Sequence, residues 1–213
     1  MDAALLPCGE QAVLVELSGT DAAMAAAAEI GRLRETGADP WRRLVDVVPG
    51  ARTVLVTFDH PLAGSAVPQA IRDALAAMRV EVAVGPAATL VVPCRYDGPD
   101  LGVVAELTGL SVAGVVDAHT SAVWRVAFGG FAPGFAYLVG GPSLLHVPRR
   151  EVPRASVPAG AVGLAGDYTG IYPRSSPGGW RLIGSTDLVL WDAERRPPAL
   201  LTPGTDVRFE AVP

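Results

Sequence analysis

Apolar positions in the first part of the chain switch repeatedly between alternating and helical spacing. Alternation predicts a strand over residues 12–17, and an alanine-rich stretch that follows the potential caps Thr20 and Asp21 predicts a helix over residues 21–35. The other expected elements are strands over 44–48 and 53–58 joined by a Pro49-Gly50 turn, a helix over 67–78, and a strand over 80–84. This β-α-β-β-α-β order predicts a ferredoxin-like α+β domain over residues 1–86.

The pattern from residue 87 onward is different. We expect a strand over 89–93, a helix over 101–107 that stops at Gly109, and a helix over 112–119 that Ser111 can cap and that ends at His119. Short apolar runs separated by Gly/Pro turns follow at residues 123–128, 161–164, 182–183, 188–191 and 207–212. Many short strands with such turns predict a closed or nearly closed β-barrel over residues 87–213.

The run GDYTGIYPRSSPGGWRLIGST, residues 166–186, combines glycine, proline, aromatic and hydroxyl residues. Tyr168, Tyr172 and Trp180 are too large and apolar for a flexible tether, and the prolines and the Gly178-Gly179 pair break any helical pattern. We therefore interpret this run as an ordered loop packed by its own aromatic side chains.

Composition removes several classes of chemistry. All 17 basic residues are arginine, so the chain has no P-loop lysine, no Schiff-base lysine and no lysine that could carry biotin. The arginines are dispersed along a chain of net charge -5, which is unlike a nucleic-acid-binding surface. Any nucleotide must be held by other groups or by another chain.

Cysteine, histidine and hydropathy patterns predict neither a metal site nor a membrane segment. Cys8 and Cys94 lie far apart and are expected to be structural thiols, and His60, His119 and His146 lack the spacing of a metal-binding pair. The apolar stretches are too short to cross a bilayer, and the N-terminus has neither a positive n-region nor an apolar h-region. A cytoplasmic protein is expected.

Three sequence blocks carry a resemblance to a known family. They are FGGFAPGFAYL at residues 128–138, PRREVPRASVPAG at residues 148–160, and the run 166–186. With VVPGARTVLVTFD at residues 47–59, they resemble the KipI, or allophanate hydrolase subunit 1, family, now usually described as the B subunit of the prokaryotic ATP-dependent 5-oxoprolinase. The resemblance covers nearly the whole chain. It implies a small N-terminal α+β domain followed by a cyclophilin-like β-barrel.

The resemblance also implies partners and a reaction. The expected partner is the C subunit, or allophanate hydrolase subunit 2-type protein, which has a related barrel, and a third protein, an A subunit of the LamB/YcsF type, is implied for complete 5-oxoprolinase. The implied reaction opens the lactam of 5-oxo-L-proline to L-glutamate with hydrolysis of ATP. The chain alone is expected to be inactive.

Site roles are hypotheses built on this reaction, which needs anion-binding groups and a surface that excludes water more than it needs a strong nucleophile. His119 is considered as a general acid or base, with a structural histidine as the alternative. Arg154 or Arg174 is considered as the group that grips the substrate carboxylate, and a solvated or interfacial arginine patch is the alternative for Arg154. The expected substrate- or anion-binding residues are Pro133, Gly134, Tyr172, Arg174, Ser176, Gly178, Gly179, Trp180 and Thr186. Packing at the rim of the barrel is the alternative for Tyr172 and Trp180.

The chain departs from the family pattern at three positions. Tyr168 stands where relatives commonly have glutamine, Ala136 where proline is usual, and Ala161 where serine is usual. Substrate choice is therefore open.

Other functions remain possible at this point. Members of the family named for kinase inhibition bind a sensor histidine kinase, and allophanate hydrolase or a urea amidolyase-type carboxyltransferase component is the nearest enzymatic alternative. Peptidyl-prolyl isomerisation is suggested by the barrel analogy alone, and no isomerase motif supports it.

Overall fold

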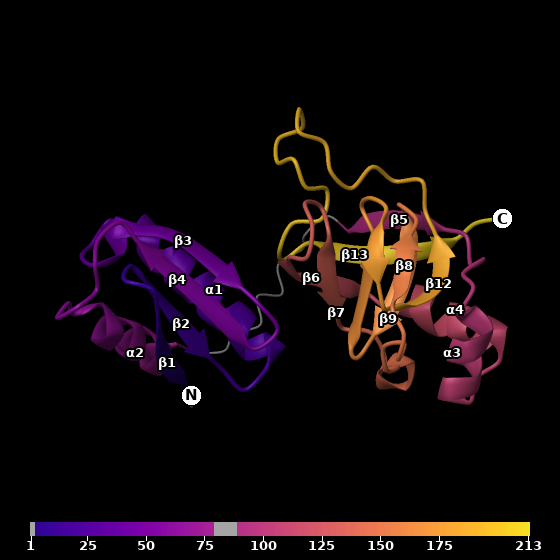
Figure 1. The fold of residues 1–213 in the computed structure, drawn as a ribbon, viewed down its shortest axis with the longest axis horizontal. Helices are drawn as coiled ribbons and strands as arrows, with labels where there is room; N and C mark the ends of the chain where they lie inside the picture. The colour runs from indigo at the N-terminus through magenta and orange to yellow at the C-terminus, as the bar shows by residue number, and fades with distance from the viewer. Residues whose placement is uncertain (1–2, 79–88) are drawn as a thin grey trace. The chain divides into compact units, whose positions relative to one another are not determined.

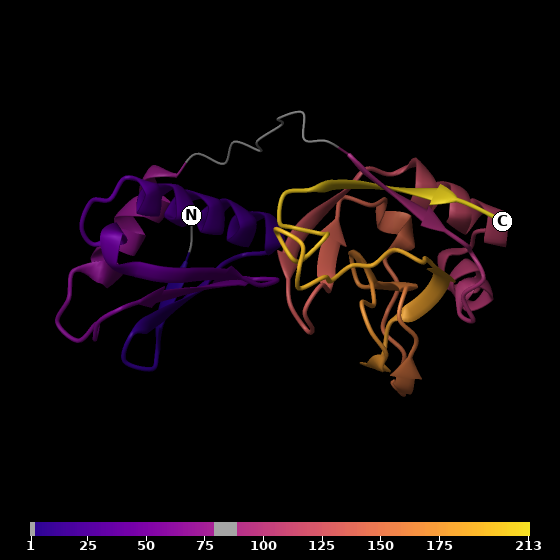
Figure 2. The same ribbon diagram turned by 90° about the horizontal axis from the view of Figure 1, so that it is seen from above.

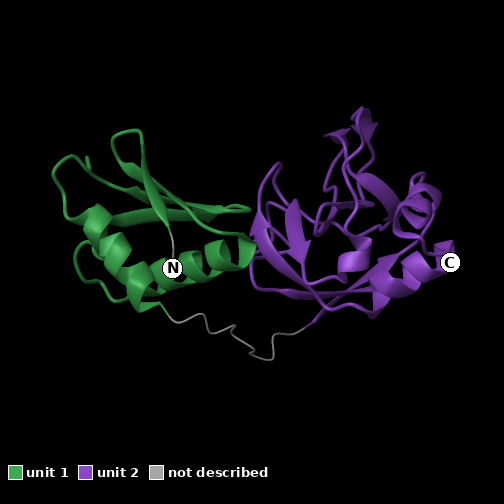
Figure 3. Ribbon diagram, turned by 90° about the horizontal axis from the view of Figure 1, so that it is seen from below, with its two compact units in different colours: residues 1–85 green, residues 86–213 purple. Residues whose placement is uncertain are grey.

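The computed structural model describes residues 3–78 and 89–213, which form two compact units, residues 1–85 and 86–213 (Figure 3). Unit 1 is a four-stranded antiparallel sheet in the order β1-β2-β4-β3, with α1 and α2 packed on one face (Figures 1 and 2). Its elements are β1 (Ala4–Cys8), β2 (Ala12–Glu16), α1 (Thr20–Glu35), β3 (Leu44–Pro49), β4 (Thr53–Phe58) and α2 (Val67–Ala77), with a short 3-10 helix at Trp41–Arg43.

Alternation along β2 and β4 builds the core of unit 1. Val13, Val15, Val54 and Val56 point to the helix-covered face, where they pack with apolar residues of α1 and α2, including Ile30. The intervening residues of both strands lie on the other face and are only partly buried. One face of the sheet therefore carries the hydrophobic core.

Two expectations for unit 1 change. Strand β1 was not predicted, and it pairs with β2 at the edge of the sheet. The predicted caps of α1 are wrong: the N-cap is Gly19, which has no side chain, and the Thr20 hydroxyl donates to Ala51 O at 2.9 Å. The strand expected at 80–84 lies outside the described residues, so the ferredoxin-like arrangement stays a prediction.

Unit 2 is built on a seven-stranded sheet in the order β12-β9-β10-β7-β6-β13-β5 (Figure 1). Arg95, just after β5, and Ser185 of β12 exchange two backbone hydrogen bonds of 2.8 Å, so the two edges of the sheet meet and nearly close a barrel. The elements are β5 (Leu90–Cys94), α3 (Leu101–Thr108), α4 (Val112–Ser121), β6 (Trp124–Gly129), β7 (Ala136–Val139), β8 (Arg154–Val157), β9 (Ala161–Ala165), β10 (Tyr168–Ile171), β11 (Ser176–Gly178), β12 (Arg181–Ser185) and β13 (Asp206–Ala211), with a 3-10 turn at Ser143–Leu145.

The helices α3 and α4 pack against β12 and β13. As expected, α3 ends at Gly109, which adopts a left-handed conformation (φ 71°), and Ser111 caps α4 by accepting a hydrogen bond from Gly114 N at 3.0 Å. Within the described ranges no single helix is long and apolar enough to span a membrane, although α3 and α4, bent by 88°, pass that test as a pair.

The run 166–186 is not a single loop, contrary to the sequence interpretation. It contains β10, β11 and β12, and β11 pairs with β8 as a separate two-stranded ribbon. Its glycines and prolines depress strand propensity, but long-range pairing with β7, β8 and β9 overrides that preference. Conversely, the strand expected at 188–191 does not form, and only Trp191 makes an isolated bridge, to Ala199.

Candidate functional site

Two of the sequence blocks, residues 128–138 and 166–186, meet in one group of aromatic side chains on the outer side of the barrel sheet, and Val157 of the third block packs in the same apolar cluster. Along β9, Val162 and Leu164 point into the barrel core, whereas Ala161 and Ala165 belong to a second apolar cluster on the opposite face. The rings on that outer face form what we call the aromatic cluster: Phe128, Phe131, Phe135, Tyr137, Tyr168, Tyr172 and Trp180.

Glycines form the floor on which Trp180 lies. A Cβ added to Gly163 would lie 3.2 Å from Trp180 Cβ, and one added to Gly170 would lie 3.0 Å from the indole ring and 2.9 Å from Ala136 O. Only glycine lets the strands β9 and β10 approach the indole so closely. Gly163 and Gly170 thus serve packing of the tryptophan.

Tyr137 links the two sides of the aromatic cluster. Its ring stacks on Phe128 with centroids 4.5 Å apart and makes edge contacts with Tyr168 at 5.5 Å and Trp180 at 5.6 Å. Tyr137 and Tyr168 are only half-buried, unlike Trp180. The two phenol rings therefore border the solvent-facing part of the cluster.

Phe131 is the exposed member of the cluster. Its side chain is 59% exposed, although it contacts Phe135 and Tyr172 edge to face. Its backbone has φ 67°, a left-handed conformation that costs a non-glycine residue of this size roughly 1–3 kcal/mol. An aromatic ring held outward by a strained backbone is typical of a functional position rather than of core packing.

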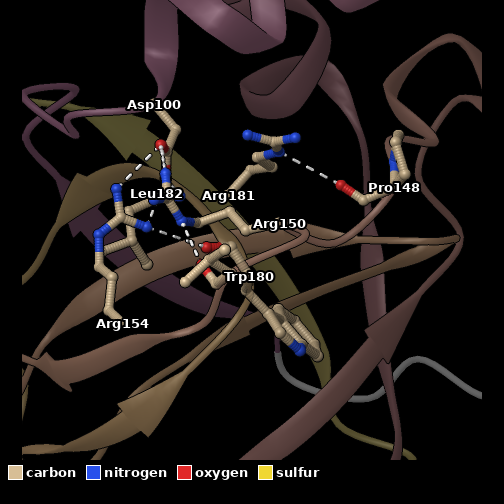
Figure 4. A network of polar contacts seen from close by, with 8 residues as sticks. Asp100, Pro148, Arg150, Arg154, Trp180, Arg181 and Leu182 are labelled. Carbon is tan, nitrogen blue, oxygen red and sulfur yellow. Dashed lines mark hydrogen bonds and ion pairs between the residues drawn. The ribbon is translucent and has the colours of Figure 1, made fainter.

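A buried carboxylate, Asp100, organises the basic residues beside the cluster (Figure 4). It accepts hydrogen bonds from Arg154 Nη2 at 2.9 Å, Arg150 Nη1 at 3.1 Å and the backbone N–H of Leu182 at 2.7 Å. Burial alone would raise the pKa of Asp100, but the hydrogen bonds from Arg154 and Leu182 and the nearby positive charges outweigh it and hold that pKa below its usual range. Asp100 therefore stays ionised and joins the start of α3 to the segment before β8 and to β12.

This network changes the role expected of Arg154. Its guanidinium is committed to Asp100 and also reaches Trp180 O at 3.5 Å, so its hydrogen-bonding groups face protein partners. That geometry favours a positioning role over a direct grip on a substrate carboxylate.

His119 lies inside the barrel rather than at a surface. It is fully buried, and its Nε2 and Nδ1 lie 2.9 Å from Thr169 Oγ1 and 2.8 Å from the Tyr96 hydroxyl. Thr169 also donates to Gly163 O, so its oxygen accepts from His119 Nε2–H, which leaves Nδ1 to accept from Tyr96. Burial lowers the pKa of His119 to about 3, and the neutral ring favours the structural alternative.

The expected glycine and hydroxyl positions lie in structural contacts. Gly134 (φ 84°) is buried beneath Trp191, whose Cβ would be 2.8 Å from an added Cβ, and the neighbouring Pro133 is exposed. Thr186 is buried and donates its N–H to Gly160 O at 2.9 Å. None of these contacts presents an evident anion-binding group.

The residues of β11 and its flanks divide in the same way. A Cβ at Gly178 would clash with the Tyr172 hydroxyl, and Gly179 O accepts from Arg150 N at 2.8 Å. Ser176 is half-buried and bonds to Arg174 O at 3.5 Å. The Arg174 side chain is exposed, and within the described chain it makes no hydrogen bond or ion pair.

The aromatic cluster thus unites Tyr172 and Trp180, which were expected at the site, with rings that were not. Phe135, Tyr137 and Asp100 were not expected as site residues. Aromatic spacing within residues 128–138 was the available signal for the rings, whereas a lone aspartate before an apolar helix gave little. In residues 3–78 and 89–213, no group of three or more His, Cys, Asp or Glu side chains could hold a metal ion.

Comparison with known proteins places these features in a wider context. Residues 3–201 match the family model described as carboxyltransferase domain, subdomain C and D. The B subunit of 5-oxoprolinase from Escherichia coli O157:H7 is 42% identical over 205 residues, which are 94% of this chain and 92% of that relative. Curated relatives from Bacillus subtilis and Haemophilus influenzae carry that same name.

Two solved structures extend the comparison. TTHA0988 superposes with a TM-score of 0.76 and 34% identity over 95% of this chain, which spans only 40% of the length of TTHA0988. The urea carboxylase of Kluyveromyces lactis has a TM-score of 0.70 with 20% identity, over 99% of this chain and 22% of the larger protein. At that identity the second likeness shows the fold alone.

Proposed function

Because this chain belongs to the carboxyltransferase-domain family, subdomains C and D, and within it to the KipI group, we propose that it is the B subunit of an ATP-dependent 5-oxoprolinase. The observation that carries the proposal is the meeting of the three sequence blocks in the aromatic cluster and the Asp100 network. The similarity to relatives named as this same 5-oxoprolinase component, over almost the whole of one of them, supports the same role.

The reaction would convert 5-oxo-L-proline, ATP and two water molecules into L-glutamate, ADP and phosphate, with one water consumed in opening the lactam C–N bond and one in the hydrolysis of ATP. A lactam is a poor electrophile, and transfer of a phosphoryl group to its oxygen makes its carbon open to attack by water. The described residues of the aromatic cluster supply no strong nucleophile, so this chain would contribute a water-poor aromatic wall and fixed positive charge.

ATP would be a co-substrate of the whole complex and not of this chain alone. The chain has no lysine, and the arginines Arg150 and Arg154 are already engaged by Asp100. The cluster's surroundings therefore fit a small organic ligand better than a triphosphate. We propose that a partner protein provides most of the contacts to the nucleotide.

A heteromeric assembly follows from the same proposal. The expected partners are the C subunit, which is an allophanate hydrolase subunit 2-type protein, and a LamB/YcsF-type A subunit, in the cytoplasm. Exposed apolar side chains in unit 2 support a covered surface: Phe131 is 59%, Val152 72%, Val189 65% and Trp191 42% exposed. The chain alone would be inactive.

The test is reconstitution. The chain is co-expressed with its two expected partners, and glutamate release from 5-oxo-L-proline is measured with and without ATP. We expect ATP-dependent release from the complete complex and none when this chain is omitted. A verified complex that releases no glutamate would overturn the proposal, and the same assay with allophanate tests the alternative amide substrate.

A further inference from the structure

Three arginines lie in the segment 148–154, and the structure separates their roles. Arg150 and Arg154 bond to Asp100, with distances of 3.1 and 2.9 Å. Arg149, which precedes both in the chain, is exposed, and its side chain makes no hydrogen bond or ion pair in the part of the chain that the structure describes. Its five N–H donors are therefore free for a ligand.

The position of Arg149 is fixed although its guanidinium is free. The preceding carbonyl, Pro148 O, accepts from Arg181 Nε at 3.3 Å, as Figure 4 shows, and the following amide, Arg150 N, donates to Gly179 O at 2.8 Å. Its backbone is thus held on both sides by β12 and the residue after β11. A fixed backbone lowers the entropy lost when the side chain orders around a ligand.

The guanidinium of Arg149 lies over the aromatic cluster. Its Cζ is 6.0 Å from the centroid of the Trp180 ring, at the limit of a cation–π contact. Trp180 cannot move away, because it is buried against Gly163 and Gly170. A flat ring and a free planar cation therefore stand next to each other.

The local charge also favours an anion. Asp100 is the acidic group of the network, and it is already balanced by Arg150 and Arg154. Glu151, exposed in the same segment, adds one negative charge, while Arg149 and Arg181 add two positive charges that form no ion pair among the described residues, so the group as a whole stays net positive. A carboxylate approaching Arg149 would meet net positive charge.

We propose that Arg149, rather than Arg154, binds the carboxylate of a small cyclic amide whose ring lies against the aromatic cluster beside Trp180. This inference rests on the proposed function for the identity of the amide, 5-oxo-L-proline. A guanidinium can hold a carboxylate through two parallel N–H···O bonds, and the aromatic surface accepts the apolar edge of the ring. Arg150, Arg154 and Asp100 then act as positioning residues.

The experiment compares Arg149→Gln and Arg149→Lys with Arg208→Gln in the assembled complex. Arg208 is an exposed arginine of β13 with no partner in the described chain, so its variant controls for the loss of one surface charge. We expect Arg149→Gln to raise KM for 5-oxo-L-proline about 10- to 100-fold, the loss of a charged hydrogen bond, with a much smaller change in kcat. Arg149→Lys should recover only part of this loss, and Arg208→Gln should leave KM unchanged.

A second ligand tests whether Arg149 recognises the carboxylate itself. The uncharged carboxamide of 5-oxoproline should bind the wild-type complex more weakly than the acid, and Arg149→Gln should abolish this difference. An unchanged KM and an unchanged preference for the acid in Arg149→Gln would overturn the inference.

A binding measurement separates this inference from the proposed reaction. The indole N–H signal of Trp180 is followed by NMR in the assembled complex during titration with 5-oxo-L-proline and with its carboxamide. If the complex shows no hydrolysis but the acid shifts this signal in wild type and not in Arg149→Gln, the proposed function fails and the carboxylate site stands. If neither ligand shifts the signal of a complex that does hydrolyse, the carboxylate site fails and the function stands.

Discussion

Replacing Asp100 by asparagine should destabilise unit 2 strongly. Asparagine keeps one acceptor oxygen but replaces the other with an NH2 group, so donors from Arg150, Arg154 or Leu182 N would face another donor. Breaking a buried ion pair by removing one partner costs about 3–5 kcal/mol. Both arginine side chains here reach solvent in part, so we expect the free energy of unfolding to fall by about 2–4 kcal/mol.

Urea denaturation followed by tryptophan fluorescence measures this change, because Trp124, Trp180 and Trp191 belong to unit 2. Asp187→Asn is the matched control. Asp187 makes two hydrogen bonds to Arg95, of 2.8 and 2.9 Å, but is 84% exposed, so its loss should leave the urea midpoint close to wild type. An Asp100→Asn variant as stable as Asp187→Asn would refute the claim that burial makes the Asp100 ion pair contribute more to the free energy of unfolding than an exposed one.

The pH dependence of the same pair has a definite sign. The folded pKa of Asp100 is lower than its value in the unfolded chain, so the folded state binds fewer protons at mildly acidic pH. Its contribution to stability is present above the unfolded pKa, near 4, and is lost as the pH falls through the lower folded pKa. Asp100→Asn should lack this part of the acid destabilisation.

Further predictions concern burial elsewhere in the chain. The pKa of His119 is lowered to about 3, so its contribution to stability is complete above about pH 6.5 and is lost as the pH falls toward 3. In that window the free energy of unfolding, measured with urea, should fall by up to about 1.4 kcal/mol per pH unit. His119→Gln should remove this pH dependence. Gly170→Ala should lower the free energy of unfolding by about 1–3 kcal/mol, because its Cβ would crowd the Trp180 indole and Ala136 O. Gly102→Ala in α3, where nothing lies within 4 Å of an added Cβ, should be neutral or stabilising in the same assay. A thiol reagent at pH 8 should label the exposed Cys8 and spare Cys94, which is buried and whose pKa is raised to about 12; rapid labelling of both in the native protein would contradict the burial of Cys94.

The sequence predicted the elements with clear periodicity and missed those that depend on pairing. The helices α1, α2, α3 and α4 and the strands β4 and β6 lie within a residue or two of their expected bounds, since each buries a regular apolar stripe. Strand β1 contains Pro7 and is mostly exposed, so it shows no alternation. Strands β8, β10 and β11 are rich in glycine, proline or polar residues and form through long-range partners.

The site was predictable as a neighbourhood but not as a set of roles. Aromatic and arginine residues in the three blocks correctly indicated segments that lie together. Which arginines are held in place and which stay free for a ligand depends on Asp100, which lies 50 positions from Arg150 and 54 from Arg154 in the sequence. No local pattern records such a distant partner, and for that reason the sequence could not show that Arg154 is engaged by Asp100.

The place of β13 in the barrel has a consequence for how the protein is made. This strand is the last of the barrel along the chain, yet it lies between β6 and β5, antiparallel to one and parallel to the other. During synthesis the ribosome must release residues 206–211 before β6 gains its second strand neighbour and β5 gains its neighbour in the sheet, whereas the described elements of unit 1 are complete much earlier. Newly made chains would therefore expose the open edges of β5 and β6 until residues 206–211 have emerged, and chaperone dependence should be concentrated in that interval.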